Sequence, residues 1–592
     1  MGGESSPASL SLFLGVLCDS VVLPLPIPMK PSRVNTRLLL LLLGGSLLRL
    51  LTLGDKALWL DEVLTALFSF GREMADIPQG QFFPVSELPL HLSLNPEASC
   101  QEIAITLARE STHPPLFFCW LQQWLRLLAP LGLSLADELR SLPALLGVLL
   151  IGTMYWLNRL ALSPQAGLLT AGLVAVSPFA VYLSQEARHY TLPLLLISLS
   201  LGGLMSWIRC RLGDRPLNVG TRPLWVICHS IGLYSHYFMA IAYLAQMATY
   251  ITLRLGWNRL SWTHSSTPTP HRFSKREMAD LITLTLPGLL FLPWLSQLSQ
   301  HLQRSETDWF QPFEPSWTDH LAPLGQTLAS WVVMWVTLPI EQQPWAIAIP
   351  SGLAMLGITA WLARMTWQGG ERLWSEKSRR LPLLLFLLVT AWTLLGFAIL
   401  VYGFGKDITV APRYHFVYYP SLCALVAAAL SRHDSRKSPA IALVVGLISS
   451  LVVISGFAFE KPYQPRQIAQ QLVRSPSIPL EVVIGYENSQ EIALGLSFAL
   501  ELPPPTQMAF LSRQQGYEQT WQHLAQLPHS VQVPDTPSSA AEWDLWIIAP
   551  GLREAEYPPQ LLRQGLGCDR IPDEYYRLGI PYQRYHCQHP GV

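Results

Sequence analysis

The chain has 592 residues, of which half are hydrophobic and only 14% are charged. Lys and Arg balance Asp and Glu at 40 each, which excludes the overall basicity typical of nucleic-acid-binding proteins. Apolar stretches of about 20 residues recur along most of the chain, which excludes a soluble globular fold and indicates a polytopic α-helical membrane protein.

The first segment, residues 1–37, does not have the residue order of a secretory signal. A weakly apolar stretch at 8–29 is broken by three prolines, and the basic residues of "MKPSRVNTR" follow it. A secretory signal carries its basic residues before its apolar run. Either Met29 is the true start, or residues 1–37 are a cytoplasmic lead.

Eleven segments are predicted to span the membrane: 38–54, 141–158, 165–183, 191–208, 223–238, 239–255, 280–298, 344–362, 381–402, 414–430 and 439–458. Two more apolar segments, 115–132 and 321–338, carry glutamines and prolines. If these two are interfacial helices, every basic cluster falls in the cytoplasm, as the positive-inside rule requires. Those clusters are Arg209–Arg222, Arg254–Arg276, Arg364–Arg380 and Arg432–Lys437. The N-terminus is then inside and the C-terminus outside.

The same topology gathers the unusual polar residues on the outer face. They lie in loop 55–140, "SQEARHY" at 184–190, "SHY" at 235–237, loop 299–343 and "KDITVAPRYHF" at 406–416. Polar side chains that could take part in binding or catalysis therefore lie at the outer ends of the spans, on one side of the membrane.

Composition changes after residue 459, which divides the chain into a membrane domain, 38–459, and a C-terminal domain, 460–592. Three short apolar runs, 481–486, 508–511 and 544–550, alternate with helix-like stretches at 465–474, 489–500 and 518–526. This alternation predicts a small α/β domain outside the membrane. Cys568 and Cys587 lie in it and are candidates for a disulfide, whereas no Cys/His spacing typical of a metal site occurs.

Asp61 and Glu62 follow the first span by a few residues. Asp61 is either the N-cap of a helix over 62–70 or a general base held near the membrane for a lipid-borne substrate. His113, in "THPPLFF", either marks a proline-fixed helix start or lines a site.

Glu186 and Arg188 lie between two spans with almost no loop. They form either a local ion pair at the boundary or a site in which Arg188 binds a phosphate while Glu186 fixes it or binds a metal. His236 faces the same side, either as a structural residue or as a ligand. Arg413, seven residues after Lys406, is a further candidate contact for an anionic group.

The order "WLDE…THPPLFF…RSLPALLGVL…SPFAVYLSQEARHYTL…SHYF…PRYHFVYYP" resembles integral-membrane glycosyltransferases of the GT-C type. The nearest branch is glycosyltransferase family 39, with protein O-mannosyltransferases, lipid A aminoarabinose transferase and bacterial Rgt-like enzymes. The resemblance covers residues 38 to 459. It implies a plasma-membrane enzyme that uses a polyprenyl-phosphate-linked sugar on the periplasmic face, with inversion at the anomeric carbon.

The resemblance also implies roles for single residues. Asp61 matches the family's acidic base, and Glu62 completes the acidic pair. The remaining matches concern the donor phosphate: Arg188 and Tyr190 in "EARHY", and Arg413 and Tyr414 in the late "RY" signature, with Lys406 beside them. Some relatives use a divalent metal, for which Glu186 and His236 are the candidates here. The sequence lacks the MIR domain of the eukaryotic protein O-mannosyltransferases, which argues against a direct equivalent of those enzymes.

These observations predict a transferase acting on a hexosyl or pentosyl donor, with a glycan, lipid or protein as acceptor. The alternative is a transporter or flippase for a lipid-linked sugar, although transporters place ionisable residues mid-membrane and are built from repeated halves, which this sequence does not show.

Overall fold

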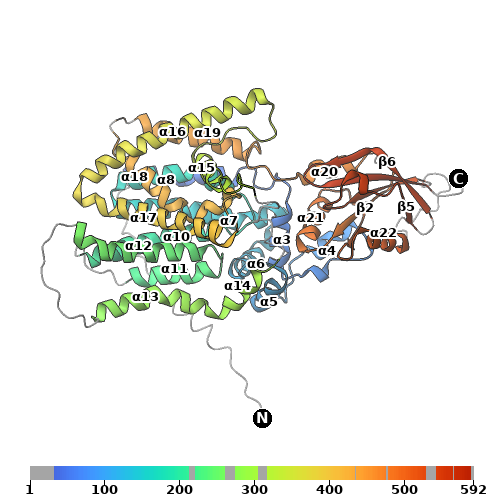
Figure 1. Cartoon of the computed structure of the whole chain (residues 1–592), viewed down its shortest axis with the longest axis horizontal. Helices are drawn as coiled ribbons and strands as arrows, with labels where there is room; N and C mark the ends of the chain where they lie inside the picture. Colours follow the sequence, from blue (N-terminus) through green and yellow to red (C-terminus); the bar gives the residue numbers. More distant parts are fainter. Residues whose placement is uncertain are drawn as a thin grey trace, which may run out of the picture.

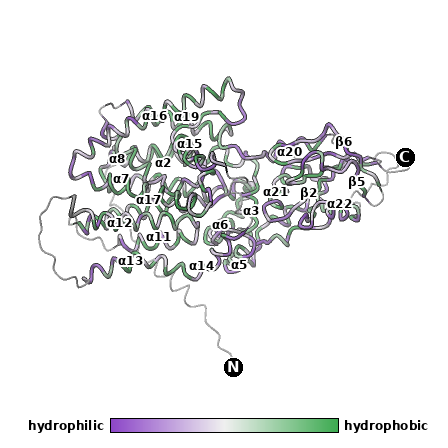
Figure 2. Tube along the Cα trace, in the orientation of Figure 1, coloured by the Kyte–Doolittle hydropathy of each residue, from purple (hydrophilic) through white to green (hydrophobic). Residues whose placement is uncertain are grey.

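The computed structural model describes residues 33–212, 220–260, 274–304, 316–433, 435, 437–474, 478–528, 542–563 and 566–588. It consists of a helical bundle and a sheet domain placed at one end of that bundle (Figure 1). Hydrophobic residues dominate the bundle, and hydrophilic segments are frequent at its ends and in the sheet domain (Figure 2). Most of the predicted N-terminal lead, residues 1–32, lies outside the described residues.

The helices of the bundle occupy all eleven predicted spans. They are α2 (Arg33–Leu50), α7 (Leu135–Ala161), α8 (Pro164–Ala175), α9 (Pro178–Ser184), α10 (Thr191–Arg211), α11 (Thr221–Leu233), α12 (Met239–Leu260), α13 (Lys275–Phe291), α14 (Leu295–His301), α16 (Trp345–Ser375), α17 (Arg380–Ala398), α18 (Tyr419–Leu430) and α19 (Lys437–Ile454). Among the described residues, six helical segments are long and apolar enough to cross a membrane, or seven if the bent pair α8–α9 is one span. The predicted polytopic helical architecture is thereby confirmed.

The pair α8–α9 bends by 59° within the predicted span 165–183. Pro178 has no N–H to continue the α8 ladder, and Ser177 accepts a hydrogen bond from the Ala180 N–H to start a new helix. The second helix, α9, ends at Ser184, and residues 185–190 form a short turn before α10.

The predicted interfacial segments are helices too short to span the bilayer. The helix α6 (Leu116–Leu128) has 13 residues and α15 (Ala322–Trp335) has 14, about 20 Å each at 1.5 Å per residue. In the first long loop, α6 is accompanied by α3 (Leu60–Ser69), α4 (Leu88–His91) and α5 (Cys100–Glu110).

The sheet domain has seven strands in the order β1-β3-β2-β4-β7-β6-β5. The strands are β1 (Phe82–Pro84), β2 (Leu480–Tyr486), β3 (Gln507–Ser512), β4 (Glu542–Ile548), β5 (Gln560–Arg563), β6 (Leu566–Arg577) and β7 (Pro581–Gln588). The predicted apolar runs form the parallel strands β2, β3 and β4, in which Val482 lies between Met508 and Trp546. The predicted helical stretches form α20 (Pro465–Leu472), α21 (Ser489–Ala499) and α22 (Tyr517–Gln526).

The sheet is not built from the C-terminal residues alone. The edge strand β1 comes from the first long loop and pairs antiparallel with β3, with Phe83 opposite Met508. In addition, α21 packs against α3, the helix that carries Asp61 and Glu62. The first loop thus joins the sheet domain to the adjacent end of the helical bundle, the mouth of the bundle.

Candidate active site

Asp61 and Glu62 lie in the first turn of α3, where the N-terminal dipole favours carboxylates. Trp59, in extended conformation, is the N-cap residue of this helix, so Asp61 does not have the capping position that the sequence left open. Successive residues of an α-helix point about 100° apart. The two neighbouring carboxylates therefore have different surroundings.

The Glu62 carboxylate is buried and bound from two sides. Arg140 donates to both of its oxygens, from Nε to Oε1 at 2.8 Å and from Nη2 to Oε2 at 2.7 Å, and the Ala187 N–H donates to Oε1 at 2.8 Å. Burial alone would raise the Glu62 pKa, but the Arg140 charge and these hydrogen bonds lower it. Arg140 also donates to the carbonyl oxygens of Leu53, Lys56 and Ala57. Glu62 thus clamps the first loop to α7 and the 185–190 turn, and is not positioned beside Asp61 for proton transfer.

Asp61 faces two guanidinium groups. Its Oδ2 lies 3.8 Å from Nη2 of Arg188 and 3.6 Å from Nη2 of Arg413. These residues come from three distant parts of the chain, and the Asp61 side chain remains 15% exposed against 4% for Arg188. These are ion-pair distances, too long for hydrogen bonds, so neither guanidinium is hydrogen-bonded to the Asp61 carboxylate across these contacts.

Arg188 is held in place by the first long loop. Its Nη1 donates to the Asp61 carbonyl at 2.9 Å and to the Thr65 hydroxyl at 3.0 Å, and its Nη2 lies 3.2 Å from Nε2 of His113. Burial and the Arg188 charge lower the His113 pKa well below its ordinary value. His113 is therefore neutral at physiological pH and can accept the Arg188 hydrogen bond.

Aromatic rings line the other side of the two arginines. The Arg188 guanidinium lies 5.9 Å from the Tyr190 ring centre, and that of Arg413 lies 5.4 Å from Tyr414. The Tyr190 ring also contacts Tyr414 and His236, at 6.3 and 5.7 Å between centres. The predicted residues Tyr190, Tyr414 and His236 thus form one wall of the cluster.

Glu186 pairs with a lysine that the sequence did not single out. Its Oε1 accepts from the ammonium group of Lys461, which also lies 4.2 Å from the Trp59 ring centre and 5.0 Å from that of Tyr182. Lys461 follows the last span, and only its position at a membrane boundary could have drawn attention to it. Lys406 lies in the turn after η7 (Ile399–Gly403), where its backbone N–H donates to the Leu400 carbonyl.

The donor set does not fit a divalent cation. Asp61 faces two cationic groups and Glu186 is paired with Lys461, so both carboxylates already have cationic partners. His236 uses its Nδ1 to accept the Phe238 N–H. No group of three metal-ligating side chains occurs among the described residues.

Two hollows adjoin the start of α3. A cavity of about 310 Å³ is lined by Trp59, Glu186 and Lys461 among others. A smaller one of about 30 Å³ is bounded by Asp61, His113 and Arg188, together with Ser489 and Gln490 at the start of α21. The sheet domain therefore forms part of the wall next to Asp61.

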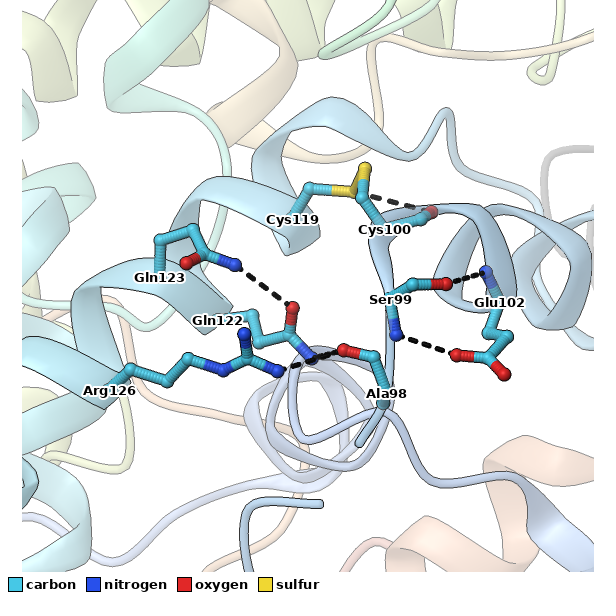
Figure 3. Close-up of a disulfide and its surroundings, with 8 residues drawn as sticks. All are labelled: Ala98, Ser99, Cys100, Glu102, Cys119, Gln122, Gln123 and Arg126. Carbon is cyan, nitrogen blue, oxygen red and sulfur yellow. Dashed lines mark hydrogen bonds between the residues drawn. A yellow bond between two sulfur atoms is a disulfide. The ribbon is translucent and has the colours of Figure 1, made fainter. Parts of the chain in front are cut away.

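Two disulfides occur among the described residues. The predicted pair Cys568–Cys587 is confirmed and joins β6 to β7. The pair Cys100–Cys119, which the sequence did not predict, joins the starts of α5 and α6 (Figure 3). Beside it, the side chains of Gln122 and Arg126 donate to the Ala98 carbonyl. This bridge closes the loop that carries His113.

Comparisons with known proteins give matches among solved structures only. No family model matches the chain, and no curated protein does. ArnT from Cupriavidus metallidurans, solved in the apo state, aligns over 94% of this chain and 98% of its own, with 10% identity and a TM-score of 0.47. The same protein bound to undecaprenyl phosphate gives 12% identity and a TM-score of 0.46, over 93% of this chain and 97% of its own.

The Archaeoglobus fulgidus oligosaccharyltransferase, solved with a tethered acceptor peptide, aligns over 79% of this chain with 12% identity and a TM-score of 0.38. This chain spans 63% of the length of that archaeal protein.

Proposed function

We propose that this protein is a glycosyltransferase that moves a sugar from a polyprenyl-phosphate donor to an acceptor hydroxyl on the extracytoplasmic face of the membrane. One observation carries the proposal: Asp61 lies within 4 Å of both Arg188 and Arg413, at the mouth of a membrane-spanning bundle. A carboxylate next to two cations provides a proton acceptor and a phosphate site in one place. The motif order of the GT-C type membrane glycosyltransferases supports the same function.

The reaction is a single displacement. The acceptor oxygen bonds to the anomeric carbon while its proton passes to the Asp61 carboxylate. The bond between that carbon and the phosphate oxygen breaks, and its electron pair leaves with polyprenyl phosphate. Arg188 and Arg413 stabilise the charge that develops on the phosphate. One displacement inverts the anomeric configuration, and neither Glu62 nor a metal has a part in these steps.

The outer location is supported by the distribution of charge and disulfides. Residues of the basic clusters form ion pairs with acidic partners: Arg211 and Arg222 both bind Asp280 on α13, and Arg432 pairs with Glu376. The start of α13 lies at the end of the bundle farthest from the sheet domain (Figure 1). Both disulfides lie on the side of Asp61 and the sheet domain, as expected for an oxidising compartment.

The test is transfer by the purified full-length protein. The protein is incubated with a panel of polyprenyl-phosphate-linked sugars, hexoses and pentoses, and membrane extracts as acceptors. We expect release of polyprenyl phosphate and a labelled product of inverted configuration with at least one donor. A protein that binds these lipids and moves them between leaflets without releasing polyprenyl phosphate would be a flippase, and the proposal would be wrong.

A further inference from the structure

The larger cavity next to α3 has the features of a ligand site. Its volume of about 310 Å³ lies in the range of small-molecule pockets. Its wall combines the turn after α2, the start of α3, the end of α9 and residues 458–466, which lead from the bundle into the sheet domain. The linker between the two domains is therefore part of the cavity.

Charged side chains of both signs line the cavity. Three cations, Lys56, Arg140 and Lys461, face two carboxylates, Glu62 and Glu186. Glu62 is bound to Arg140 at both oxygens, and Glu186 is the carboxylate that pairs with Lys461. Glu460, half-buried like the two lysines, is a third carboxylate of the wall, and the exposed rim adds Asp55 and Arg466, where solvent screens the charges.

Lys56 is the second lysine of the cavity wall. Its ammonium group donates to the Val453 carbonyl at 2.8 Å, and no ion pair in the described part of the chain includes it. Burial and the neighbouring charges of Arg140 and Lys461 lower the Lys56 pKa to about 8. An anion entering the cavity would relieve this repulsion.

Lys461 connects the cavity to the candidate active site. Its ammonium lies 4.2 Å from the Trp59 ring centre, and the Arg413 guanidinium lies 5.4 Å from the same centre. Trp59 is two residues from Asp61. A phosphate beside this ring would be in reach of both cations.

Two buried polar atoms of the cavity wall point to a hydroxyl-bearing ligand. Glu186 Oε2 and Trp59 Nε1 have no hydrogen-bond partner among the described residues. Both residues are more than nine-tenths buried. Buried polar groups are rarely left unpaired, and one hydroxyl can both accept from an indole N–H and donate to a carboxylate.

We propose that Lys461 is a further donor-binding residue: its ammonium group exchanges Glu186 for the phosphate of the lipid-linked donor, and the freed Glu186 accepts a hydrogen bond from a hydroxyl of the donor's sugar. This inference rests on the proposed function and names the lysine and the carboxylate that recognise the donor's headgroup. It also gives the domain linker a direct part in donor binding.

The test measures binding of polyprenyl phosphate, without sugar, to the full-length protein in nanodiscs. We expect Lys461→Ala to weaken binding by about 10-fold or more, the effect of losing a charged hydrogen bond, and Lys461→Arg to retain most of the affinity. Glu186→Gln has the opposite expected effect, tighter binding, because it frees Lys461 for the phosphate. Lys377→Ala, at an exposed lysine remote from the cavity, is the matched control.

A purely structural ion pair would make Lys461→Ala and Glu186→Gln behave alike. Equal weakening by both variants, or unchanged binding in Lys461→Ala, overturns the inference and leaves the proposed function standing. If the wild-type protein itself binds no polyprenyl phosphate, the proposed function fails as well. In transfer assays with the matching donor, Glu186→Gln is expected to lower kcat/KM although it binds the sugar-free lipid more tightly.

Discussion

Asp61 and Glu62 show how two adjacent residues of the same type acquire different roles. Helix geometry points the two side chains in different directions, and the two carboxylates then differ in burial and in binding partners. Glu62 is 1% exposed and bound on both oxygens, whereas Asp61 keeps an exposed edge facing two cations at ion-pair distance. Of the two carboxylates, Asp61 therefore fits the proposed role of the base.

Asp61→Asn is predicted to abolish most transfer while preserving the fold. Loss of a positioned base typically costs about 10²–10⁴-fold in rate. The fold is expected to persist because Arg188 also binds the backbone carbonyl of residue 61, which the substitution retains. Turnover with the matching lipid-linked sugar and the melting temperature in detergent check this. Near-normal transfer by a well-folded Asn variant would refute the role of Asp61.

Glu62→Gln is predicted to act on stability instead. Removing the charge leaves the buried Arg140 guanidinium without its counter-ion, which costs about 3–5 kcal/mol for a buried pair. A denaturation series in detergent at pH 7 measures this cost. A loss below about 1 kcal/mol would show that the pair is not a structural clamp.

The same pair predicts a pH dependence. Because the folded protein holds the Glu62 pKa below its ordinary value of 4.5, the stabilisation is complete above pH 4.5. It is lost as the pH falls through the lower pKa of the folded state. The stability difference between the wild-type protein and Glu62→Gln should therefore shrink in that acidic range.

At the scale of elements, helix breaks position the site. The span 165–183 bends by 59° between α8 and α9, and the 185–190 turn follows α9 directly. This turn supplies Glu186, the Ala187 N–H and Arg188 to three different partners. A straight helix would spread these residues around its circumference, since neighbours point about 100° apart.

The Cys100–Cys119 bridge is predicted to stabilise the loop that presents His113 to Arg188. Replacing both cysteines by Ser should lower the free energy of unfolding by roughly 3 kcal/mol, as expected for a closed loop of this length. Chemical denaturation in detergent measures the loss. Cys210→Ser, at a free and partly buried cysteine, serves as the control. Peptide mapping without reductant that finds free thiols at 100 and 119 would contradict the bridge.

At the scale of the whole molecule, the first long loop unites the two domains. It contributes β1 to the edge of the sheet, and its helix α3 covers α21. Most residues of α21 are buried, among them Ile492, Leu496 and Phe498. The sheet domain therefore depends on residues that lie some 400 positions earlier in the sequence.

Residues 460–592 expressed alone are predicted to aggregate. Without the first loop, the β3 edge is unpaired and the apolar face of α21 is exposed, and both features favour association. Size-exclusion chromatography and amide NMR spectra of the isolated segment test this prediction. A monomeric, cooperatively folded fragment would show that the sheet domain is independent.

The orientation of the molecule can be read by labelling. In a chain whose unpaired cysteines are replaced, Glu518→Cys on α22 should react with a membrane-impermeant maleimide in intact cells or spheroplasts. Lys377→Cys, in a basic cluster, should react only after permeabilisation. Both positions are exposed, so accessibility reports only the side of the membrane. The reverse pattern would place the candidate site in the cytoplasm.

The sequence by itself determined the helical membrane architecture, the exclusion of the short helices α6 and α15 from the predicted spans and the α/β class of the C-terminal domain. These features depend on local runs of apolar residues, whose length and period fix the element type. It also indicated Asp61, Arg188 and Arg413 as candidates at one membrane boundary. That indication came from the order of the motifs along the chain.

Only the tertiary structure decided which side chains meet. Glu62 pairs with Arg140, Glu186 with Lys461, β1 with β3 and Cys100 with Cys119, although none of these pairs has a signature in local sequence. Buried charges and strand edges are satisfied by whichever partner the packing brings near, and packing is a property of the whole chain. The sequence alone was therefore silent on these particular pairs.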